Sequence, residues 1–557
     1  MSVATKPISI EPGSEAFPLL TPTHIDRLRP YARKREVRAG DVLFEPGDSN
    51  VPVFVVLAGG LDILQPCPSA ERTLVHHVPG SFTGEFSMIS GQNALLRGRV
   101  TDDGELIEIA AADFRSVIAK DAELGDIFMR AYILRRMLLI TEGAGNVIVL
   151  GSRHCANTLR MRDFLGRNGY PYKFLDLDTD ERSQSILDHF EIKMHEVPVV
   201  ICNSRIVMRN PSLAEVANCL GMNLSIDTSQ VRDVIVVGAG PSGLAAAVYA
   251  ASEGLDVVVV ETSTPGGQAG SSSRIENYLG FPTGISGADL TGRALAQAQK
   301  FGARLMVAHS AVRLNCDRRP YQVILDEGTT LATRSIVLAA GAQYKKLPVA
   351  NLAKFEGQGV YYGATFMEAQ LCEGEDLVVV GGGNSAGQAA VFLSQKARKV
   401  YMLVRSGQLS DTMSRYLVQR IESNPAIELH YHTEITSVDG DNHLECITWR
   451  DRDGGQISAH DIRHLFIMTG ASPRTEWLAG CLALDNKGFV LTGYDLDRPM
   501  LDAKSWPLSR PPQILETSLP GVFAVGDIRS GNVKRVASAV GEGSIAIHLV
   551  HQALAEM

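Results

Sequence analysis

The chain has 557 residues, a length that favours three to four domains of about 150 residues each. Hydrophobic residues make up 45% and charged residues 21%, a balance that excludes a wholly disordered or fibrous chain. The net charge of −9 disfavours nucleic-acid binding over the whole surface. The eight cysteines form no C-x-x-C pair, and no apolar run reaches about 18 residues, which argues against a disulfide scaffold, a zinc ribbon and a membrane span. We therefore expect a soluble cytoplasmic protein with reduced cysteines.

Residues 17–140 follow a short tail (1–16) and alternate strand-like runs with glycine-rich turns. The runs 42–44, 53–57, 61–64 and 106–109 predict strands, and helical patterns at 23–31 and 124–140 flank them. Two motifs stand out, the stretch 38–48 and the sequence Phe-Thr-Gly-Glu at 82–85. In these motifs the segment resembles the cyclic-nucleotide-binding domain family, which implies a β-roll.

The ligand of this β-roll is in doubt. In the resembled family Glu85 would accept a ribose hydroxyl, and an Arg followed by Ser or Thr would neutralise the cyclic phosphate. The chain has Ala94 and Leu95 there, and an apolar pair cannot compensate a buried phosphate. Arg97 or Arg99 could substitute if the strand turned one of them inward. We favour a degenerate regulatory or dimerising module over a working nucleotide sensor, and the missing helix-turn-helix disfavours a transcription factor.

Residues 144–222 predict a small α/β unit. Strands are expected at 146–149, 172–177 and 197–201, and helices at 157–167, 182–190 and 213–220. Cys155-Ala-Asn-Thr158 before the first helix and Glu196-Val-Pro-Val199 resemble the thioredoxin/glutaredoxin fold, the latter its cis-proline segment. A cysteine at a helix N-terminus should have a lowered thiol pKa, so Cys155 is the candidate catalytic residue, with monothiol chemistry. The alternative is a spacer or docking surface without redox chemistry.

A glycine-rich loop follows the polar linker at 223–232. Strand 234–237 leads directly into Gly-Ala-Gly-Pro-Ser-Gly, with Gly238, Gly240 and Gly243, and then into an Ala-rich helix. The next strand ends in Glu261, 23 residues after Gly238. Glycines let the backbone approach a pyrophosphate, and an acid at this distance can hold a ribose diol. The loop therefore predicts a dinucleotide site suited to the adenosine of FAD.

The same pattern recurs once. Strand 377–380 leads into a loop and helix whose candidate binding residues are Gly381, Gly383, Asn384, Ser385 and Ala386. Arg405 follows 24 residues after Gly381, where a guanidinium favours a 2′-phosphate and hence NADPH. The alternative is a solvated surface arginine. NADH stays open as the second possible nucleotide.

Two dinucleotide sites in one chain imply hydride transfer from a nicotinamide to a flavin. From residue 233 onward the motifs resemble the low-molecular-weight thioredoxin reductase family of pyridine-nucleotide–disulfide oxidoreductases. That resemblance implies an FAD-binding domain (233–356 and 472–557) interrupted by an NAD(P)H-binding domain (357–471). Its flavin-contacting positions match Gly267, Gln268, Asn277, Gly341, Gly526, Asp527, Lys534, Arg535 and Val536. The whole is a multidomain α/β protein: a β-roll, a thioredoxin-like unit and two Rossmann-type domains.

The redox pair of that family is missing. Where its members carry Cys-Ala-Thr-Cys, this chain reads Gly-Ala-Thr-Phe at 363–366, and we expect the nearby Cys372 to pack as a small apolar residue. The lead hypothesis is an FAD-dependent NAD(P)H oxidoreductase that reduces a disulfide, through Cys155, or another external acceptor. The alternatives are a thiol-independent reductase of a ferredoxin or quinone, and a redox or nucleotide sensor without turnover. Both resembled families imply a homodimer.

Overall fold

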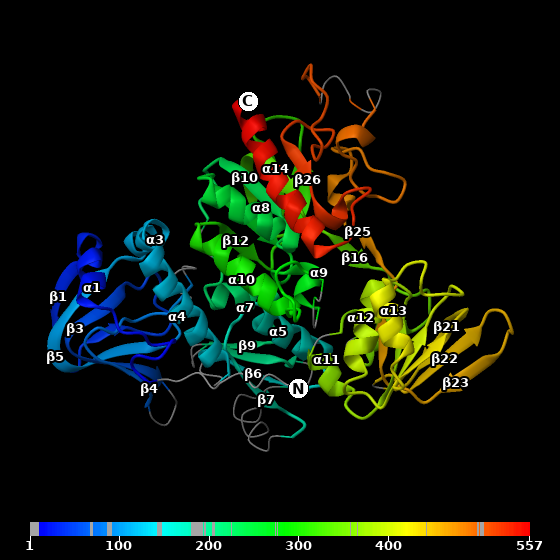
Figure 1. Ribbon diagram of the computed structural model, residues 1–557, viewed down its shortest axis with the longest axis horizontal. Helices are drawn as coiled ribbons and strands as arrows, with labels where there is room; N and C mark the ends of the chain where they lie inside the picture. Colours follow the sequence, from blue (N-terminus) through cyan, green and yellow to red (C-terminus); the bar gives the residue numbers. More distant parts are fainter. Residues whose placement is uncertain are drawn as a thin grey trace.

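The computed structural model describes most of the chain. The described residues are 11–66, 71–85, 88, 92–141, 147–179, 193, 196–202, 206–223, 226–272, 275, 277–356, 358–364, 366–441, 443–497, 501 and 506–556. Figure 1 shows a strand-rich N-terminal body in blue, a central α/β body in green and red, a smaller sheet beneath it in cyan, and a further α/β body in yellow. The first glycine-rich loop belongs to the central body, and the second belongs to the further α/β body drawn in yellow, which is called the fourth body below.

The N-terminal body is an antiparallel sheet with the strand order β1-β5-β3-β4, in which β2 pairs with β5. Its elements are α1 (Pro22–Leu28), η1 (Arg29–Tyr31), β1 (Arg33–Val37), β2 (Val42–Phe44), β3 (Val53–Pro66), β4 (Glu71–His77), β5 (Arg97–Ile109), α3 (Ala111–Lys120) and α4 (Ala122–Thr141). The prediction of separate strands at 53–57 and 61–64 is wrong, because β3 stays paired with β5 through register shifts. Gly59 permits this close pairing, since an added Cβ would lie 2.8 Å from the Asp102 carbonyl oxygen.

The smaller sheet has the order β7-β6-β8-β9, with β6 and β7 parallel and the other pairs antiparallel. Its elements are β6 (Val147–Gly151), α5 (Ala156–Arg167), β7 (Lys173–Asp176), β8 (Val199–Cys202), β9 (Ile206–Arg209) and α7 (Leu213–Cys219). The peptide bond between Val197 and Pro198 is cis. The helix predicted at 182–190 lies outside the described residues.

The central body is built on the sheet β12-β11-β10-β15-β14-β13, to which β26 adds beside β15. Its elements are β10 (Arg232–Val237), α8 (Pro241–Ser252), β11 (Val257–Glu261), α9 (Gly267–Gly270), α10 (Gly287–Lys300), β12 (Arg304–Val307), β13 (Ala311–Asn315), β14 (Tyr321–Leu325), β15 (Thr330–Leu338), η4 (Glu476–Leu478), η5 (Gly493–Asp495), β26 (Val522–Ala524), η7 (Gly526–Ile528) and α14 (Val536–Glu556). Strands β10, β11 and β12 pair in parallel, and their valine-rich runs are buried, as helix-covered parallel strands require. Helix α14 packs closely on α8: a Cβ on Gly543 would lie 2.3 Å from the Ser242 carbonyl oxygen.

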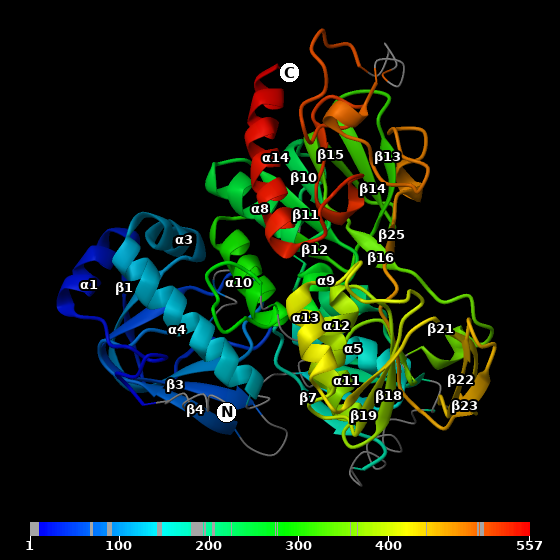
Figure 2. The same ribbon diagram turned by 45° about the vertical axis from the view of Figure 1, so that its right-hand side comes forward.

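The fourth body repeats this pattern with the parallel sheet β17-β24-β18-β19-β20 and a small antiparallel sheet β21-β22-β23. Its elements are η3 (Leu352–Phe355), β17 (Val360–Tyr361), α11 (Phe366–Leu371), β18 (Asp376–Val380), α12 (Asn384–Leu393), β19 (Lys399–Leu403), α13 (Arg415–Glu422), β20 (Ile427–His430), β21 (Thr433–Asp439), β22 (Cys446–Asp451), β23 (Ile457–His460) and β24 (Leu465–Ile467). The two connections to the central body pair as antiparallel strands, β16 (Ala342–Tyr344) with β25 (Ala471–Pro473), as Figure 2 shows.

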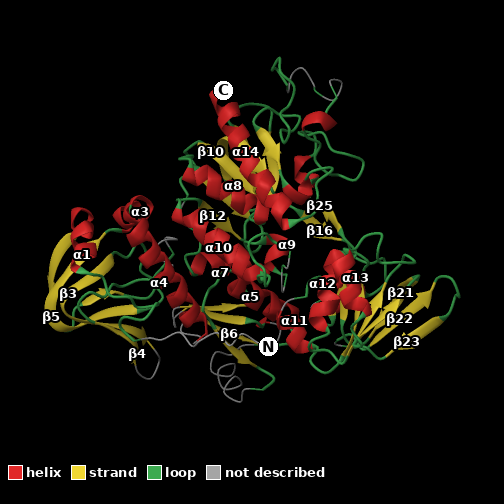
Figure 3. Cartoon of the chain, in the orientation of Figure 1, coloured by secondary structure: helices red, strands yellow, loops and turns green. Residues whose placement is uncertain are grey.

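Figure 3 shows that strands dominate the N-terminal body, whereas helices and strands alternate in the others. Within the described ranges, no helix combines the length and apolar character needed to cross a membrane. The expectation that every cysteine is reduced is wrong for one pair, because Cys316 after β13 and Cys481 after η4 form a disulfide. These two residues are 165 positions apart in the sequence, so no local spacing could reveal a pair whose Cα atoms lie 6.0 Å apart.

Candidate functional site

The first glycine-rich loop turns tightly from β10 into α8. A Cβ on Gly238 would lie 2.3 Å from the Ala339 carbonyl oxygen, and a Cβ on Gly243 would lie 1.9 Å from the Gly238 carbonyl oxygen. Gly240 is different, because the nearest atom to its built Cβ is the Gly267 Cα at 3.9 Å. Two glycines are therefore required by packing, while the third leaves open space at the start of a helix, where a pyrophosphate binds.

Glu261, at the end of β11, faces this loop. Its carboxylate accepts hydrogen bonds from the backbone N–H groups of Ala239 (2.7 Å) and Ser263 (3.0 Å). Burial raises the pKa of this carboxyl. The geometry places an acid beside the glycine-rich loop, where it can bind a ribose diol.

A second segment, at α9, closes over the first loop. The Gly266 N–H donates to the Ala239 carbonyl oxygen (2.7 Å), and the Gln268 amide donates to the Ala342 carbonyl oxygen (2.6 Å), next to Gly341. The hydroxyl of buried Thr264 has no hydrogen-bond partner among the described residues. Asn277 lies in the following loop and is exposed.

The segment from Gly526 to Val536 completes the enclosure. A Cβ on Gly526 would lie 2.6 Å from the Ser242 hydroxyl, so this turn packs against the start of α8. Burial raises the pKa of Asp527, which the charge of Lys534 partly offsets. Val536 packs in the apolar cluster that contains Ala269 of α9, whereas Lys534 and Arg535 are exposed.

These features fit FAD. The open cradle at Gly240, the Glu261 carboxylate and the unpartnered Thr264 hydroxyl surround the start of α8. The side-chain amide of Asn532, between Asp527 and Lys534, also has both polar atoms buried without a partner in the described structure. Buried polar atoms are normally hydrogen-bonded, so these orphans mark places where a polar ligand belongs.

The second glycine-rich loop repeats this design between β18 and α12. A Cβ on Gly381 would lie 2.5 Å from the Met468 carbonyl oxygen, whereas the nearest atom to one on Gly383 is 4.0 Å away. The Asn384 side chain accepts from the Ser414 N–H (2.7 Å), which ties the start of α12 to the segment before α13. Ser385 is exposed and Ala386 is buried, so the loop again opens toward a ligand on one side only.

Arg405 follows β19 and is exposed. Sequence reasoning missed two further arginines near it, Arg450 and Arg452, both of which form ion pairs with Glu434. The hydrogen bond from Arg450 is the main cause that lowers the pKa of Glu434, and the charges of Arg452 and Arg405 add to it. Arg450 lies near the end of β22 and Arg452 lies in the turn directly after it, so the short spacing of these two arginines could have drawn attention to them.

Gly363, the first residue of the stretch predicted to replace the redox pair, lies beside the segment at α9 (Gly267–Gly270), hereafter the flavin loop. A Cβ built on Gly363 would lie 3.9 Å from the Ser271 side chain, directly after α9. Cys372 is fully buried and donates from Sγ to the Glu368 carbonyl oxygen (2.8 Å), as expected for a packing residue. Burial raises the pKa of its thiol, which keeps it protonated.

Cys155 caps the N-terminus of α5 and is half-buried. The cis-proline segment lies close to it: Asn157 donates to the Asn210 side chain (3.1 Å), and the Asn210 N–H donates to the Pro198 carbonyl oxygen (2.8 Å). At the other end of α5, Arg167 donates to the Gly267 carbonyl oxygen of the flavin loop (2.9 Å). With a rise of about 1.5 Å per residue, Cys155 lies about 18 Å from Arg167 along the helix, so the structure does not bring this thiol to the flavin loop.

Comparison with known proteins identifies the family. The family described as Pyridine nucleotide-disulphide oxidoreductase matches residues 232–543, more than half of the chain. The chain belongs to this family. A second family, described as Cyclic nucleotide-binding domain, matches residues 34–121, which confirms the prediction for the N-terminal body.

Relatives of this pyridine nucleotide-disulphide oxidoreductase include thioredoxin reductases. The chain is 30% identical over 329 residues to the thioredoxin reductase of Bacillus subtilis, covering 59% of this chain and 96% of that one. It is 32% identical over 323 residues to NADPH-dependent thioredoxin reductase 3 of Arabidopsis thaliana, covering 57% of each chain. The solved thioredoxin reductase of T. acidophilum aligns with a TM-score of 0.51 at 27% identity, covering 58% of this chain and 98% of that one.

The family and the geometry agree on the type of enzyme. The chain is an NAD(P)H-dependent flavoprotein oxidoreductase of the thioredoxin-reductase-like type. When bound, FAD supplies a two-electron acceptor for the hydride of the nicotinamide. In this chain Gly240 and Gly383 are the positions that would hold the pyrophosphates, and Glu261 would hold a ribose, while β16 and β25 connect the two bodies.

Proposed function

We propose that this protein uses NADPH to reduce a disulfide, with Cys155 as the thiol that opens the substrate. The overall reaction converts NADPH, one proton and one disulfide into NADP⁺ and two thiols. The observation that carries the proposal is the hydrogen bond from Arg167 to Gly267, because it docks the helix that begins at Cys155 onto the flavin loop. The strand order β7-β6-β8-β9 and the position of Cys155 as helix cap support a thioredoxin-like role for this unit.

The distance along α5 constrains this route. Thiol–disulfide exchange requires direct contact between sulfur atoms, and Cys155 lies about 18 Å along α5 from the residue that touches the flavin loop. The Cys-Ala-Asn-Thr motif supplies only one thiol. A dithiol partner protein or two thiols of a small molecule therefore have to resolve the mixed disulfide on Cys155, which releases the second substrate thiol and the Cys155 thiol and leaves the resolving thiols as a disulfide. That disulfide has to reach the reduced flavin, where it accepts the two electrons that came from NADPH together with protons and returns to two thiols.

A second candidate function omits Cys155. Gly363 has no side chain, and among the described residues a Cβ built on it would come nearest to the Ser271 side chain, at 3.9 Å, so this function places an external acceptor here, next to the flavin loop. A quinone, a ferredoxin-type protein or a small disulfide that enters this space would need no protein thiol. The absence of sulfur at 363–366 is the specific observation that favours this route.

An anaerobic acceptor screen tests the proposed function. The FAD-loaded protein is reduced with one equivalent of NADPH, then mixed rapidly with a disulfide, a ferredoxin-type protein or a quinone, while visible flavin absorbance reports reoxidation. We expect the disulfide to give the fastest reoxidation. Faster reoxidation by the quinone or the ferredoxin would favour the thiol-independent function, and no reduction by NADPH or NADH would contradict both.

Replacement of Arg405 tests the preference for NADPH. We expect Arg405→Ala to weaken NADPH binding by about 1–3 kcal/mol, because a charge-assisted hydrogen bond to the 2′-phosphate is lost. NADH binding should change little. The measurement is titration of the protein with NADP⁺ and NAD⁺, and Arg398→Ala, at the opposite end of β19, is the control because its guanidinium pairs with Asp376. Equal losses for both nucleotides would show that Arg405 does not recognise the phosphate.

A further inference from the structure

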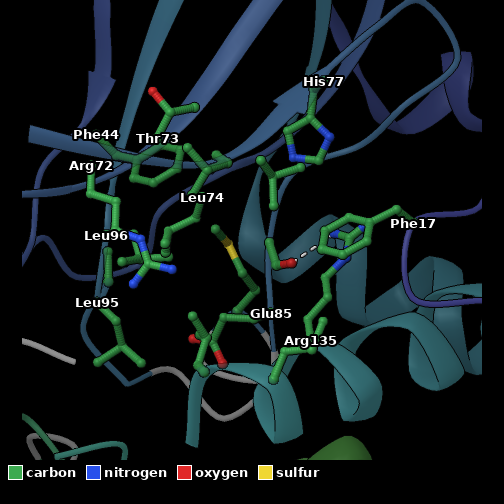
Figure 4. Close-up of a pocket in the computed structure, with 17 residues that line it drawn as sticks. Phe17, Phe44, Arg72, Thr73, Leu74, His77, Glu85, Leu95, Leu96 and Arg135 are labelled. Carbon is green, nitrogen blue, oxygen red and sulfur yellow. Dashed lines mark hydrogen bonds between the residues drawn. The ribbon is translucent and has the colours of Figure 1, made fainter. Parts of the chain in front are cut away.

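The N-terminal β-roll contains a cavity that the dinucleotide sites do not use. Its volume is about 200 Å³, and it lies between β4, the turn at 82–85 and α4, as Figure 4 shows. Ala94 and Leu95, at 6% and 3% exposure, line it at the place where the resembled family would hold the phosphate. Neither Arg97 nor Arg99 lines it, contrary to the possibility drawn from the sequence, because both are bound to Glu71. The wall at this place is therefore apolar, and a phosphate would be left uncompensated there.

The buried charges of this cavity do not favour one sign. Arg135 donates to three carbonyl oxygens, yet its Nη2 has no hydrogen-bond partner in the part of the chain described. Glu85, expected to accept a ribose hydroxyl, instead accepts a hydrogen bond from Arg136 (3.0 Å), and its Oε1 likewise has no partner among the described residues. One donor and one acceptor are left over, so the cavity selects neither an anion nor a cation by charge.

A half-buried arginine elsewhere lies where the charge balance is one-sided. Arg167 ends α5 in the unit built on the sheet β7-β6-β8-β9, hereafter the Cys155 unit, and its Nη2 donates to the Gly267 carbonyl oxygen of the flavin loop (2.9 Å). Gly267 lies against the first glycine-rich loop, since a Cβ built on it would lie 3.0 Å from the Gly240 Cα. The guanidinium is therefore held at the residue that flanks the open cradle for a pyrophosphate.

The loops that form this cradle offer no cation of their own. The stretches 238–252 and 261–272, which include the glycine-rich loop, α8 and the flavin loop, contain neither lysine nor arginine. Backbone N–H groups and the N-terminus of α8 can bind a pyrophosphate, but they carry only partial charges. A full positive charge beside the cradle therefore has to come from another part of the chain.

The partners of Arg167 leave its charge only partly compensated. Its Nη1 pairs with Asp163 one turn earlier, at 3.5 Å, and its Nε is buried with no hydrogen-bond partner in the described structure. Burial raises the pKa of Asp163, and the charge of Arg167 offsets only part of this rise. The same charge reaches Glu261 at the ribose end of the site, where it and Arg474 favour the ionised carboxylate against burial, which raises the pKa. An anion in the cradle would therefore stabilise this guanidinium.

We propose that Arg167 belongs to the FAD site and supplies the positive charge for the pyrophosphate, so that the Cys155 unit and the central body bind the cofactor together. Arg167 lies outside residues 232–543, the part of the chain that matches the pyridine nucleotide-disulphide oxidoreductase family. FAD binding and the docking of α5 on the flavin loop are then linked, and each stabilises the other. The proposal concerns FAD binding alone, so it does not depend on Cys155 or on the acceptor of the reduced flavin.

Titration of the full-length apoprotein with FAD tests this proposal. We expect Arg167→Met to lower FAD affinity about tenfold, a difference of about 1.4 kcal/mol, because the new side chain lacks the charge. Arg167→Lys, which keeps the charge, should retain most of the affinity. The control is Arg160→Met, at an exposed arginine two turns earlier on α5, which should bind FAD as the unmodified protein does.

Competition with fragments of FAD locates the effect of the charge. ADP carries two phosphates and adenosine carries none, so Arg167→Met should weaken ADP about as much as FAD and leave adenosine nearly unchanged. Hydrogen exchange of the α5 amides reports the docking: FAD should slow it in the unmodified protein and have little effect in Arg167→Met. If circular dichroism shows that Arg167→Met does not fold, the same measurements are made on Arg167→Gln.

Three results would overturn the proposal. Unchanged FAD affinity in Arg167→Met would show that the charge does not act on the cofactor. Equal losses in Arg167→Met and Arg167→Lys would show that the guanidinium only docks α5 on Gly267. Equal weakening of ADP and adenosine would place the charge of Arg167 away from the phosphates.

Discussion

Gly243→Val should remove FAD from the protein. A Cβ at position 243 would lie 1.9 Å from the Gly238 carbonyl oxygen, so either the loop or the start of α8 has to shift. Overpacking of this kind costs about 1–3 kcal/mol, and the same shift moves the N–H groups that would face the pyrophosphate. We expect FAD affinity to fall at least about 100-fold, which corresponds to roughly 2.8 kcal/mol.

The measurement is the ratio of flavin absorbance to protein absorbance after purification, followed by titration with free FAD. The matched control is Gly292→Val, because Gly292 lies within α10 and its built Cβ meets no atom within 4 Å. Circular dichroism distinguishes a folded apoprotein from an unfolded chain, and Gly243→Ala provides a milder variant if the valine prevents folding. A folded Gly243→Val protein that keeps its full content of FAD would contradict the assignment of this loop.

Both nucleotide loops could be predicted from the sequence because each depends on neighbouring residues. An apolar strand, a glycine-rich turn and a helix form one continuous stretch, and the acid or arginine that completes the site ends the next strand. The structure shows the physical reason at Gly238 and Gly381, where any side chain would collide with a carbonyl oxygen of another strand or loop. These collisions require glycine whatever the rest of the chain contains.

Other features depend on residues distant in the sequence and could not be predicted. The cavity of the β-roll combines Arg72 from β4 with Arg135 from α4, and neither belongs to the motif that suggested a nucleotide site. The prediction considered only nearby arginines, Arg97 and Arg99, which strand pairing directs toward Glu71 instead. The disulfide between Cys316 and Cys481 is a further contact of this kind.

One guanidinium links the β-roll cavity to the neighbouring α/β unit. Arg136 donates from Nη1 to Glu85 at the cavity wall and from Nε to the Gly169 carbonyl oxygen after α5 (2.6 Å). Asn93 approaches the same unit, since a Cβ on Gly221 would lie 2.4 Å from its side chain. A ligand that displaces Glu85 would therefore release one partner of Arg136, which keeps its hydrogen bonds to Gln92 (3.4 Å) and to Gly169 of the unit that contains Cys155.

Cys155→Ser should abolish disulfide reduction while flavin reduction by NADPH stays intact. A serine hydroxyl cannot form the mixed disulfide, and removal of a nucleophile lowers turnover by at least about 1,000-fold. The glycine-rich loops lie in other bodies, so anaerobic NADPH titration should give the same flavin reduction as the unmodified protein. The measurement is steady-state NADPH consumption with the disulfide that performs best in the acceptor screen. The control is Cys446→Ser, a free cysteine on β22.

A reciprocal variant distinguishes the two routes to the disulfide. Gly363→Leu would fill the space beside Ser271, where a built Cβ already lies 3.9 Å from that side chain, and so obstruct direct access to the flavin loop. If Cys155 opens the substrate, Cys155→Ser loses disulfide turnover. Gly363→Leu then lowers turnover less than Cys155→Ser does, and only because the space beside Gly363 also serves the resolving thiol. If the disulfide reacts directly beside Gly363, Cys155→Ser retains full turnover and Gly363→Leu loses it, because a half-buried thiol at the far end of α5 then takes no part in the reaction.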